Sequence, residues 1–129
     1  MSPGIIIRAA HYRGRAPIEA YGNGGFRFAD MSHRGSILCL PSGIYGWEPG
    51  DPNALSLHDL ARVLEEAEGI EILLLGMGPD LRPISRDLRT SLKDAGIVAD
   101  PMSTGAAVRT YNVLLAEERA VAAALIAVG

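Results

Sequence analysis

The sequence has little cysteine, little lysine and few aromatic residues, and each shortage argues against a class of chemistry. Cys39 is the one cysteine among 129 residues, so no disulfide can form within the chain, which fits a reducing compartment. Lys93 is the one lysine. It falls in a predicted surface helix, which argues against covalent catalysis by a lysine amine. Aromatic residues make up 5% of the chain, too few for a platform that stacks single-stranded nucleic acid.

Long apolar runs are also missing. The longest run covers residues 120–128 and is far shorter than the roughly 20 residues of a membrane-spanning helix. Residues 1–10 contain too short an apolar stretch, with the wrong flanks, for a signal peptide. We therefore expect a cytoplasmic protein without a membrane span.

The formal net charge of -3 gives no reason to expect nucleic acid as a partner. The charges are unevenly distributed, because residues 1–34 carry five arginines against Glu19 and Asp30, whereas the remainder is acidic. This distribution is compatible with a mild basic face near the N-terminus. An ordinary solvated surface is the favoured interpretation.

The length of 129 residues corresponds to one domain and allows a core without disulfides. We expect residues 1–16 to form a flexible N-terminal arm, because their glycines and arginines are untypical of a core element. Within this arm, the three isoleucines at 5–7 are candidates for an edge strand or a partner contact. Residues 17–129 are predicted to form a single α/β domain.

Short strands are predicted over residues 17–47, where apolar and polar residues alternate. Residues 22–25 (Gly-Asn-Gly-Gly) form a predicted tight turn, since glycine and asparagine tolerate positive φ. Residues 37–40 and 70–75 are continuous apolar runs, which are typical of strands buried on both faces.

Helical spacing of apolar residues begins after Ser56. Ser56 and Asp59 are expected to cap each other's backbone N–H groups, and Gly69 is expected to end this helix. A second helix is predicted over residues 83–95, opened by a proline and stopped by the glycine that follows it.

Ser103 or Thr104 is the predicted cap of a third helix that runs to about residue 117. The last segment is ambiguous, because the helix propensity of alanine would extend the helix to residue 128. We favour a break and a strand over residues 121–127, since one helix of about 25 residues would be unusually long. The order of elements predicts an α/β protein with a central, mostly parallel mixed sheet, helices on its faces and a small N-terminal β-sheet.

Ligands of such sheets bind outside the carboxyl ends of the strands. The loops expected there are residues 41–43, 76–80 and 100–104. The third loop begins a helix, whose free N–H groups at residues 104–106 are suited to an anion. The candidate counter-charges are Arg82, Arg86 and Arg109.

Known catalytic and cofactor motifs are incomplete. Gly76 and Gly78 resemble half of a dinucleotide fingerprint, but Leu81 replaces the third glycine and Pro79 disrupts the turn. Ser42 lacks the flanking glycines of a nucleophile elbow. The three histidines show no metal-ligand spacing. We expect no metal and no cofactor, and we can assign no catalytic residue.

Two polar or aromatic features admit both a structural and a functional interpretation. Trp47 is either a core residue or an exposed anchor for a partner. Arg109 and Asn112 share a face of the third helix. They either tie down a neighbouring segment by hydrogen bonds, or line the crevice or a partner interface. The candidate crevice or interface residues are Ser42, Trp47, Gly76, Gly78, Arg82, Thr104, Arg109 and Asn112.

Four stretches resemble the Mth-type domain family of unknown function. They are YGNGGFRF at 21–28, GSILCLPSGIYGW at 35–47, LLLGMG at 73–78 and residues 102–126, of which the last is the most specific. The family includes an adipogenesis-associated Mth domain-containing protein and a mitochondrial complex I assembly factor. Met77 stands where the family often has a small polar residue. Val108 stands where it often has cysteine, which excludes a thiol role there.

The resemblance implies a three-layer α/β fold whose last segment is a strand, and it supplies no catalytic residues. It favours a non-catalytic protein-binding or assembly factor, with a respiratory complex as a candidate partner. The alternative is a small-molecule or anion-binding domain, or an enzyme, that uses the crevice. The sequence leaves the partner's identity and the oligomeric state open.

Overall fold

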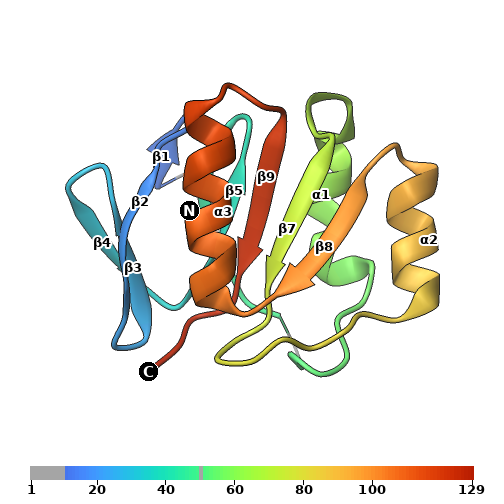
Figure 1. Cartoon of the computed structure of the whole chain (residues 1–129), viewed down its shortest axis with the longest axis horizontal. Helices are drawn as coiled ribbons and strands as arrows, with labels where there is room; N and C mark the ends of the chain where they lie inside the picture. The colour runs from blue at the N-terminus through green and yellow to red at the C-terminus, as the bar shows by residue number, and fades with distance from the viewer. Residues whose placement is uncertain (1–10, 50) are drawn as a thin grey trace, which may run out of the picture.

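The computed structural model describes residues 11–49 and 51–129. These residues form a six-stranded sheet in the order β1-β6-β5-β9-β7-β8 and a three-stranded sheet in the order β2-β3-β4 (Figure 1). The strands are β1 Tyr12–Arg13, β2 Ile18–Gly22, β3 Gly25–Phe28, β4 Met31–Arg34, β5 Ser36–Leu40, β6 Gly43–Trp47, β7 Ile72–Gly76, β8 Val98–Met102 and β9 Val121–Leu125. The α-helices are α1 Ala61–Glu65, α2 Arg86–Asp94 and α3 Thr104–Ala116, and two short 3-10 helices, η1 His58–Leu60 and η2 Ala67–Gly69, flank α1.

The large sheet is mixed, as the sequence predicts, but it is not mostly parallel, because three of its five strand pairings in the described residues are antiparallel. Strand β7 runs parallel to both β8 and β9, whereas β5 is antiparallel to β9 and β6, and β6 is antiparallel to β1. The expected small N-terminal sheet is the antiparallel β2-β3-β4. The α/β fold class with helices on the faces of a mixed sheet is therefore confirmed.

Apolar side chains lie on both faces of the large sheet, so the core has two layers. On one face, alternate residues of β5, β7 and β9 pack with Val63, Leu88 and Leu92 of α1 and α2. On the other face, the intervening residues pack with α3 and the small sheet. Figure 1 shows α3 in front of the large sheet and the small sheet to its left. Strand β9 is buried along its whole length.

The third helix and the last strand lie close to their predicted positions: α3 ends at Ala116, and β9 begins at Val121 as predicted but ends at Leu125 rather than at residue 127. The Ser103 side chain accepts a hydrogen bond from the Ala106 N–H and caps α3. At the other end, Glu118 adopts φ 59°, and backbone bonds run from Glu118 N to Leu115 O and from Arg119 N to Leu114 O. This pair of bonds is a Schellman motif, which stops the helix and turns the chain into β9.

The first two helices differ in detail from their predictions. The expected capping box exists, since the Ser56 N–H donates to the Asp59 carboxylate at 2.9 Å, but the helix that follows is divided into η1, α1 and η2. After α1, the Glu66 carboxylate accepts hydrogen bonds from the Ser42 N–H and hydroxyl, which fasten this end of the helix to the turn between β5 and β6. Helix α2 begins at Arg86 with Ser85 as its cap, three residues later than expected.

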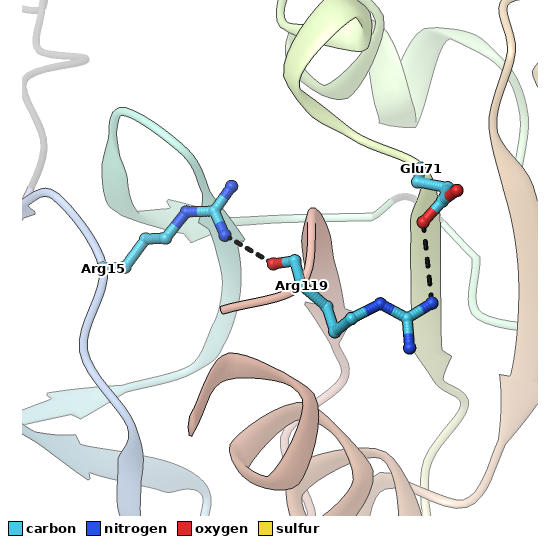
Figure 2. Close-up of polar contacts among 3 residues, drawn as sticks. All are labelled: Arg15, Glu71 and Arg119. Carbon is cyan, nitrogen blue, oxygen red and sulfur yellow. Dashed lines mark hydrogen bonds and ion pairs between the residues drawn. The ribbon is translucent and has the colours of Figure 1, made fainter. Parts of the chain in front are cut away.

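Residues 11–16 differ from the expected flexible arm, because they pair and pack with the sheet. Strand β1 pairs with β6, and Ala16 is 7% exposed. Figure 2 shows the Arg15 guanidinium donating to the Arg119 carbonyl at 3.0 Å, while the Arg119 side chain faces Glu71. The isoleucines at 5–7 lie outside the described residues.

Candidate functional site

A cavity of about 440 Å³ lies where the predicted crevice was expected, outside the carboxyl end of β7 and beside the first turn of α3. Two predicted residues, Gly78 and Arg109, line it. Its other lining residues are Tyr21, Pro79, Ser103, Gly105, Ala127, Val128 and Gly129. The wall that the sequence did not predict comes from β2 and from the residues after β9.

Thr104 holds the base of this crevice together. Its hydroxyl donates to the Ile126 carbonyl at 2.7 Å and accepts from the Gly78 N–H at 3.0 Å. The Thr104 N–H in turn donates to the Gly78 carbonyl at 2.8 Å. Thr104 is fully buried, so it links α3 to the segments after β7 and β9 rather than facing a ligand.

Gly76 lies beneath the same junction and is needed for space. A Cβ atom at Gly76 would lie 2.9 Å from the Leu125 side chain and 3.0 Å from Thr104 Cα. Because Thr104 Cα belongs to the backbone, any side chain at this position forces α3 away from the sheet. Gly76 is therefore a packing residue beneath the crevice.

The first turn of α3 has few N–H groups left for an anion. The Thr104 N–H donates to Gly78, the Ala106 N–H to the Ser103 side chain and the Ala107 N–H to the Ser103 carbonyl. An anion site at a helix N-terminus depends on free N–H groups. Of the N–H groups expected to bind an anion, those of Thr104 and Ala106 thus already have partners within the chain.

Arg109 lies at the surface next to Tyr21. Tyr21 is 42% exposed, and its hydroxyl lies so close to Gly105 that a Cβ there would overlap it. The Arg109 Nη1 atom is 3.6 Å from the same position. One turn further along α3, Val113 is 56% exposed. Tyr21, Arg109 and Val113 form a continuous exposed strip, which we call the α3 surface.

Asn112, three residues along α3 from Arg109, also lies against β2. Its amide oxygen accepts from the Ile18 N–H, and its amide nitrogen donates to the Ile18 carbonyl, each at 2.9 Å. The two bonds fasten α3 to the first residue of β2. Asn112 thus ties α3 to β2, whereas Arg109 lines the crevice.

Ser42 lies in the turn between β5 and β6, away from the crevice lining. Its hydroxyl donates to the Glu66 carboxylate at 2.6 Å and lies 2.5 Å from the Tyr45 hydroxyl. The Ser42 N–H also donates to Glu66, at 2.9 Å. These contacts fasten the β5-β6 turn to the segment after α1.

Trp47 and Arg82 also lie apart from the crevice. The Trp47 ring is buried, and its Nε1–H donates to the Asp59 carbonyl at 2.8 Å, which matches the interpretation as a core residue. Arg82 donates to the Asn53 side chain at 2.8 Å. Neither side chain faces Arg109 across a shared cavity.

The buried titratable pair Cys39 and Tyr111 lies between the sheet and α3. Burial raises the pKa of the Cys39 thiol to about 12, with a smaller opposing effect of its hydrogen bond with Tyr111. Burial, and next the neighbouring Cys39, raise the pKa of Tyr111. Both groups are neutral at pH 7, so Cys39 is an inert core residue in this fold.

Within residues 11–49 and 51–129, no group of three or more histidine, cysteine or acidic side chains is arranged to hold a metal ion. In the same part of the chain, no helix is both long enough and apolar enough to cross a membrane.

Tyr21 and Gly105 are among the site residues that the sequence did not predict. Tyr21 lies in a segment recognised only as a strand, and its partner Gly105 is far away in sequence. The one local signal is Gly105 itself, since glycine in the first turn of a helix is an unfavourable choice unless another group approaches closely.

Comparison with known proteins gives a family match. A protein-family model described as "Protein of unknown function (DUF498/DUF598)" matches residues 18–126. An uncharacterized protein of Rhodobacter capsulatus is 40% identical over 119 residues, which cover 92% of this chain and 90% of that protein.

A second relative carries a functional name. NADH dehydrogenase [ubiquinone] 1 alpha subcomplex assembly factor 3 of Danio rerio is 31% identical over 109 residues. The match covers 84% of this chain and 63% of that protein. The chain thus corresponds to somewhat less than two thirds of the assembly factor.

Solved structures share the fold. A crystal structure described as an outer membrane protein of Bartonella henselae has a TM-score of 0.88 and 61% identity, covering 92% of this chain and 100% of that one. A solution structure of a Bordetella pertussis protein, described as a Mth938-like domain, has a TM-score of 0.73 at 23% identity, with 98% and 90% coverage. The second comparison bears on the fold alone.

Proposed function

The chain belongs to the DUF498/DUF598 family of proteins of unknown function, and from this we propose that it is a non-catalytic protein-binding factor that assists assembly of a larger complex. The similarity to the Danio rerio assembly factor supports this proposal, because it extends over 84% of the chain. The candidate partner is a subunit of a respiratory NADH dehydrogenase.

The observation that carries the proposal is the α3 surface of Tyr21, Arg109 and Val113. Tyrosine and arginine are the residue types that most often dominate the binding energy of protein interfaces. Val113 adds exposed apolar area one helical turn from Arg109. Arg109 and Val113 lie on a regular helix that Asn112 and Thr104 fasten to neighbouring segments, and Tyr21 lies on strand β2, so the side chains are presented on a rigid support.

The alternative of a small-molecule or anion-binding crevice receives less support. The cavity beside Gly78 is of a suitable size at about 440 Å³. However, three N–H groups of the first turn of α3 and the Thr104 hydroxyl already have partners within the chain. Arg109 is then the main polar contribution, and an exposed arginine suits a protein partner.

A deletion and complementation experiment tests the proposal. Cells lacking the gene should assemble less NADH:ubiquinone oxidoreductase, as seen by in-gel activity on native gels, and the wild-type gene should restore it. Arg109→Glu and Val113→Asp should fail to restore assembly although both proteins fold. Arg86→Glu is the matched control, because Arg86 is an exposed arginine on α2, which packs on the other face of the sheet.

Two outcomes would overturn the proposal. One is normal assembly of the oxidoreductase in the deletion strain. The other is full complementation by both α3-surface variants, since that result would separate the function from this surface.

The cellular location of the protein is a separate part of the proposal. The sequence predicts a cytoplasmic protein, whereas the Bartonella henselae relative is described as an outer membrane protein. We propose the cytoplasmic location, and fractionation of cells followed by immunoblotting tests it. Recovery of the protein in the membrane fraction after a high-salt wash would contradict the cytoplasmic location.

A further inference from the structure

The small sheet ends in an edge strand, β4, which pairs with β3 alone among the described residues. Figure 1 shows β4 at the left-hand margin of the molecule. An edge strand presents unpaired backbone N–H and C=O groups, to which another extended chain can bind. The groups that such a chain meets follow from the register of β3 and β4.

The backbone groups of Ser32 and Arg34 point away from β3. The Gly35 N–H donates to the Gly24 carbonyl at 2.7 Å, and the next pair along the ladder is Gly25 with Arg34. Hydrogen-bonded and non-hydrogen-bonded pairs alternate along an antiparallel ladder. Arg34 and Ser32 therefore belong to non-hydrogen-bonded pairs, and their N–H and C=O groups face the open edge of the sheet.

The side chains of Ser32 and Arg34 lie on the outer face of the small sheet. Both residues are exposed, whereas Met31 and His33, which alternate with them, are half-buried. Arg27 belongs to the same outer face, because it is the β3 partner of Ser32. Its guanidinium donates to the Ser32 hydroxyl at 2.9 Å and so reaches the edge strand.

A hollow of about 410 Å³ lies over this outer face. It is open because the residues of the neighbouring strands there are small, namely Ala20 and Gly22 on β2 and Gly25 on β3. The Arg34 Nη1 atom lies 3.8 Å from the position of a Cβ at Gly24. The Arg34 guanidinium thus lies at the end of the hollow next to the turn between β2 and β3.

The lining of the hollow is cationic. It includes Arg27 and Arg34 and contains no carboxylate. The acidic residues of segment 18–34 lie at the other end of the small sheet, where the Asp30 N–H donates to the Glu19 carboxylate at 3.2 Å. A chain with acidic side chains is therefore attracted to the half of β4 that carries Ser32 and Arg34.

We propose that β4 binds an extended segment of a partner protein that carries acidic side chains at alternate positions. The backbone of this segment pairs with the open N–H and C=O groups of Ser32 and Arg34. Because the side chains of a strand alternate between its two faces, every second residue of the segment lies on the outer face. Carboxylates at these positions accept charge-assisted hydrogen bonds from the guanidinium groups of Arg27 and Arg34.

A second copy of this chain fits the same edge less well. Pairing of two β4 strands would place Arg27 and Arg34 of both copies on one continuous sheet face. Like charges on neighbouring strands are destabilising, and charged edge strands are a common protection against self-association. The two arginines therefore favour an acidic partner over another copy of the chain.

The test is an NMR titration of the nitrogen-15-labelled full chain with two blocked peptides, each about six residues long like an ordinary strand. In the first peptide threonine and glutamate alternate, and in the second glutamine replaces every glutamate. The glutamate peptide is expected to bind roughly threefold or more tightly at low salt, and added salt should reduce this difference. The largest shifts are expected at the amide signals of Ser32 and Arg34.

Variants of the full chain separate the contribution of charge from that of backbone pairing. Arg27→Gln and Arg34→Gln are each expected to reduce the preference for the glutamate peptide by about twofold or more. Arg86→Gln is the matched control, because Arg86 is an exposed arginine on α2, far along the chain and outside the hollow.

Ser32→Pro removes an N–H that β3 does not use, so the small sheet keeps its own bonds. This variant is expected to weaken binding of both peptides by about threefold or more. Ser32→Ala retains the N–H and is its control. Thermal unfolding of each variant confirms that folded proteins are compared, and the arginine variants test the proposal even where the proline variant does not fold.

The proposal is overturned if neither peptide binds at about millimolar concentration, if the two peptides bind equally, or if the largest shifts lie outside β3 and β4. A dimer in sedimentation experiments that Ser32→Pro abolishes would assign the edge to a second copy instead. These measurements use the purified chain and no variant of the α3 surface. This proposal and the proposed assembly function can therefore fail separately.

Discussion

The side-chain amide of Asn112 on α3 pairs with the backbone of Ile18 in the manner of an adjacent strand. It accepts from the Ile18 N–H and donates to the Ile18 carbonyl, each at 2.9 Å. Ile18 is 3% exposed, so water cannot easily replace either bond. A polar residue in the middle of a helix thereby connects the small sheet to the rest of the fold.

Asn112→Ala is expected to lower the free energy of unfolding by about 1–3 kcal/mol, because two buried backbone groups of Ile18 lose their partners. Urea unfolding followed by circular dichroism measures the change. Asn53→Ala is the control: Asn53 also bonds a distant side chain, that of Arg82, but at an exposed position, where the expected loss is within about 1 kcal/mol. Equal losses in the two variants would contradict the structural role of Asn112.

Thr104→Val is expected to cost about 2–4 kcal/mol, because the isosteric valine leaves the Gly78 N–H and the Ile126 carbonyl without a partner in a buried site. Thr104→Ser keeps the hydroxyl and should cost less. Thr110→Val on the same helix should change stability by no more than about 0.5 kcal/mol. Thermal or urea unfolding ranks the three variants, and a valine variant as stable as the serine variant would refute the predicted role of the hydroxyl.

The ends of α2 and α3 use the same Schellman motif with different residues in the left-handed position. Gly96 has φ 86° after α2, and Glu118 has φ 59° after α3. Glu118→Gly is expected to stabilise the protein by roughly 0.5–1 kcal/mol, since glycine adopts this conformation without strain. Gly96→Ala is expected to destabilise it by a similar or larger amount.

Glu117→Gly is the control for this pair. Glu117 has φ -86°, so glycine there relieves no strain and is expected to reduce stability. Differential scanning calorimetry of the three variants measures the shifts in Tm. A lower Tm for Glu118→Gly than for the wild type would contradict the prediction that the left-handed conformation of Glu118 lowers the stability of the protein.

The Cys39 thiol is expected to make the free energy of unfolding decrease with pH in the alkaline range. Burial raises the pKa of this thiol from about 9 in the unfolded chain to about 12 in the folded one. The contribution of the neutral thiol to the free energy of unfolding is therefore fully present below pH 9 and is lost as the pH rises toward 12. The free energy of unfolding should fall by up to about 1.4 kcal/mol per pH unit in this window.

Cys39→Ser separates this effect from that of Tyr111, whose pKa is also raised. Serine does not titrate in this range, so the stability difference between wild type and variant should shrink as the pH increases from 8 to about 10.5. Urea unfolding at three pH values measures the difference. A constant difference would contradict a buried, titrating thiol.

Local signals in the sequence predicted the elements that depend on local chemistry. The Ser56–Asp59 capping box, the Ser103 cap and the break after residue 117 involve residues a few positions apart, and the structure contains all three. The resemblance to the Mth-type family strengthened the assignment of the last strand against the helix propensity of alanine.

Contacts between distant segments were not predictable in the same way. Strand β1 exists because Tyr12 and Arg13 find a partner in β6, and nothing in residues 11–16 alone indicates that pairing. The contacts of Tyr21 with Gly105 and of Asn112 with Ile18 also depend on how β2 packs against α3. The site could thus be located at one end of the sheet from the sequence, but its walls could not.

Strand β9 has a consequence for how the protein folds during synthesis. It is the only connection between β5 and β7 in the described part of the large sheet, and it pairs Leu125 with Ile37, which is far away in sequence. Until its alanines leave the ribosome, the two halves of the sheet remain separate, each with an unpaired edge. A nascent chain of this protein therefore depends on protection of those edges until β9 has been synthesised and can pair.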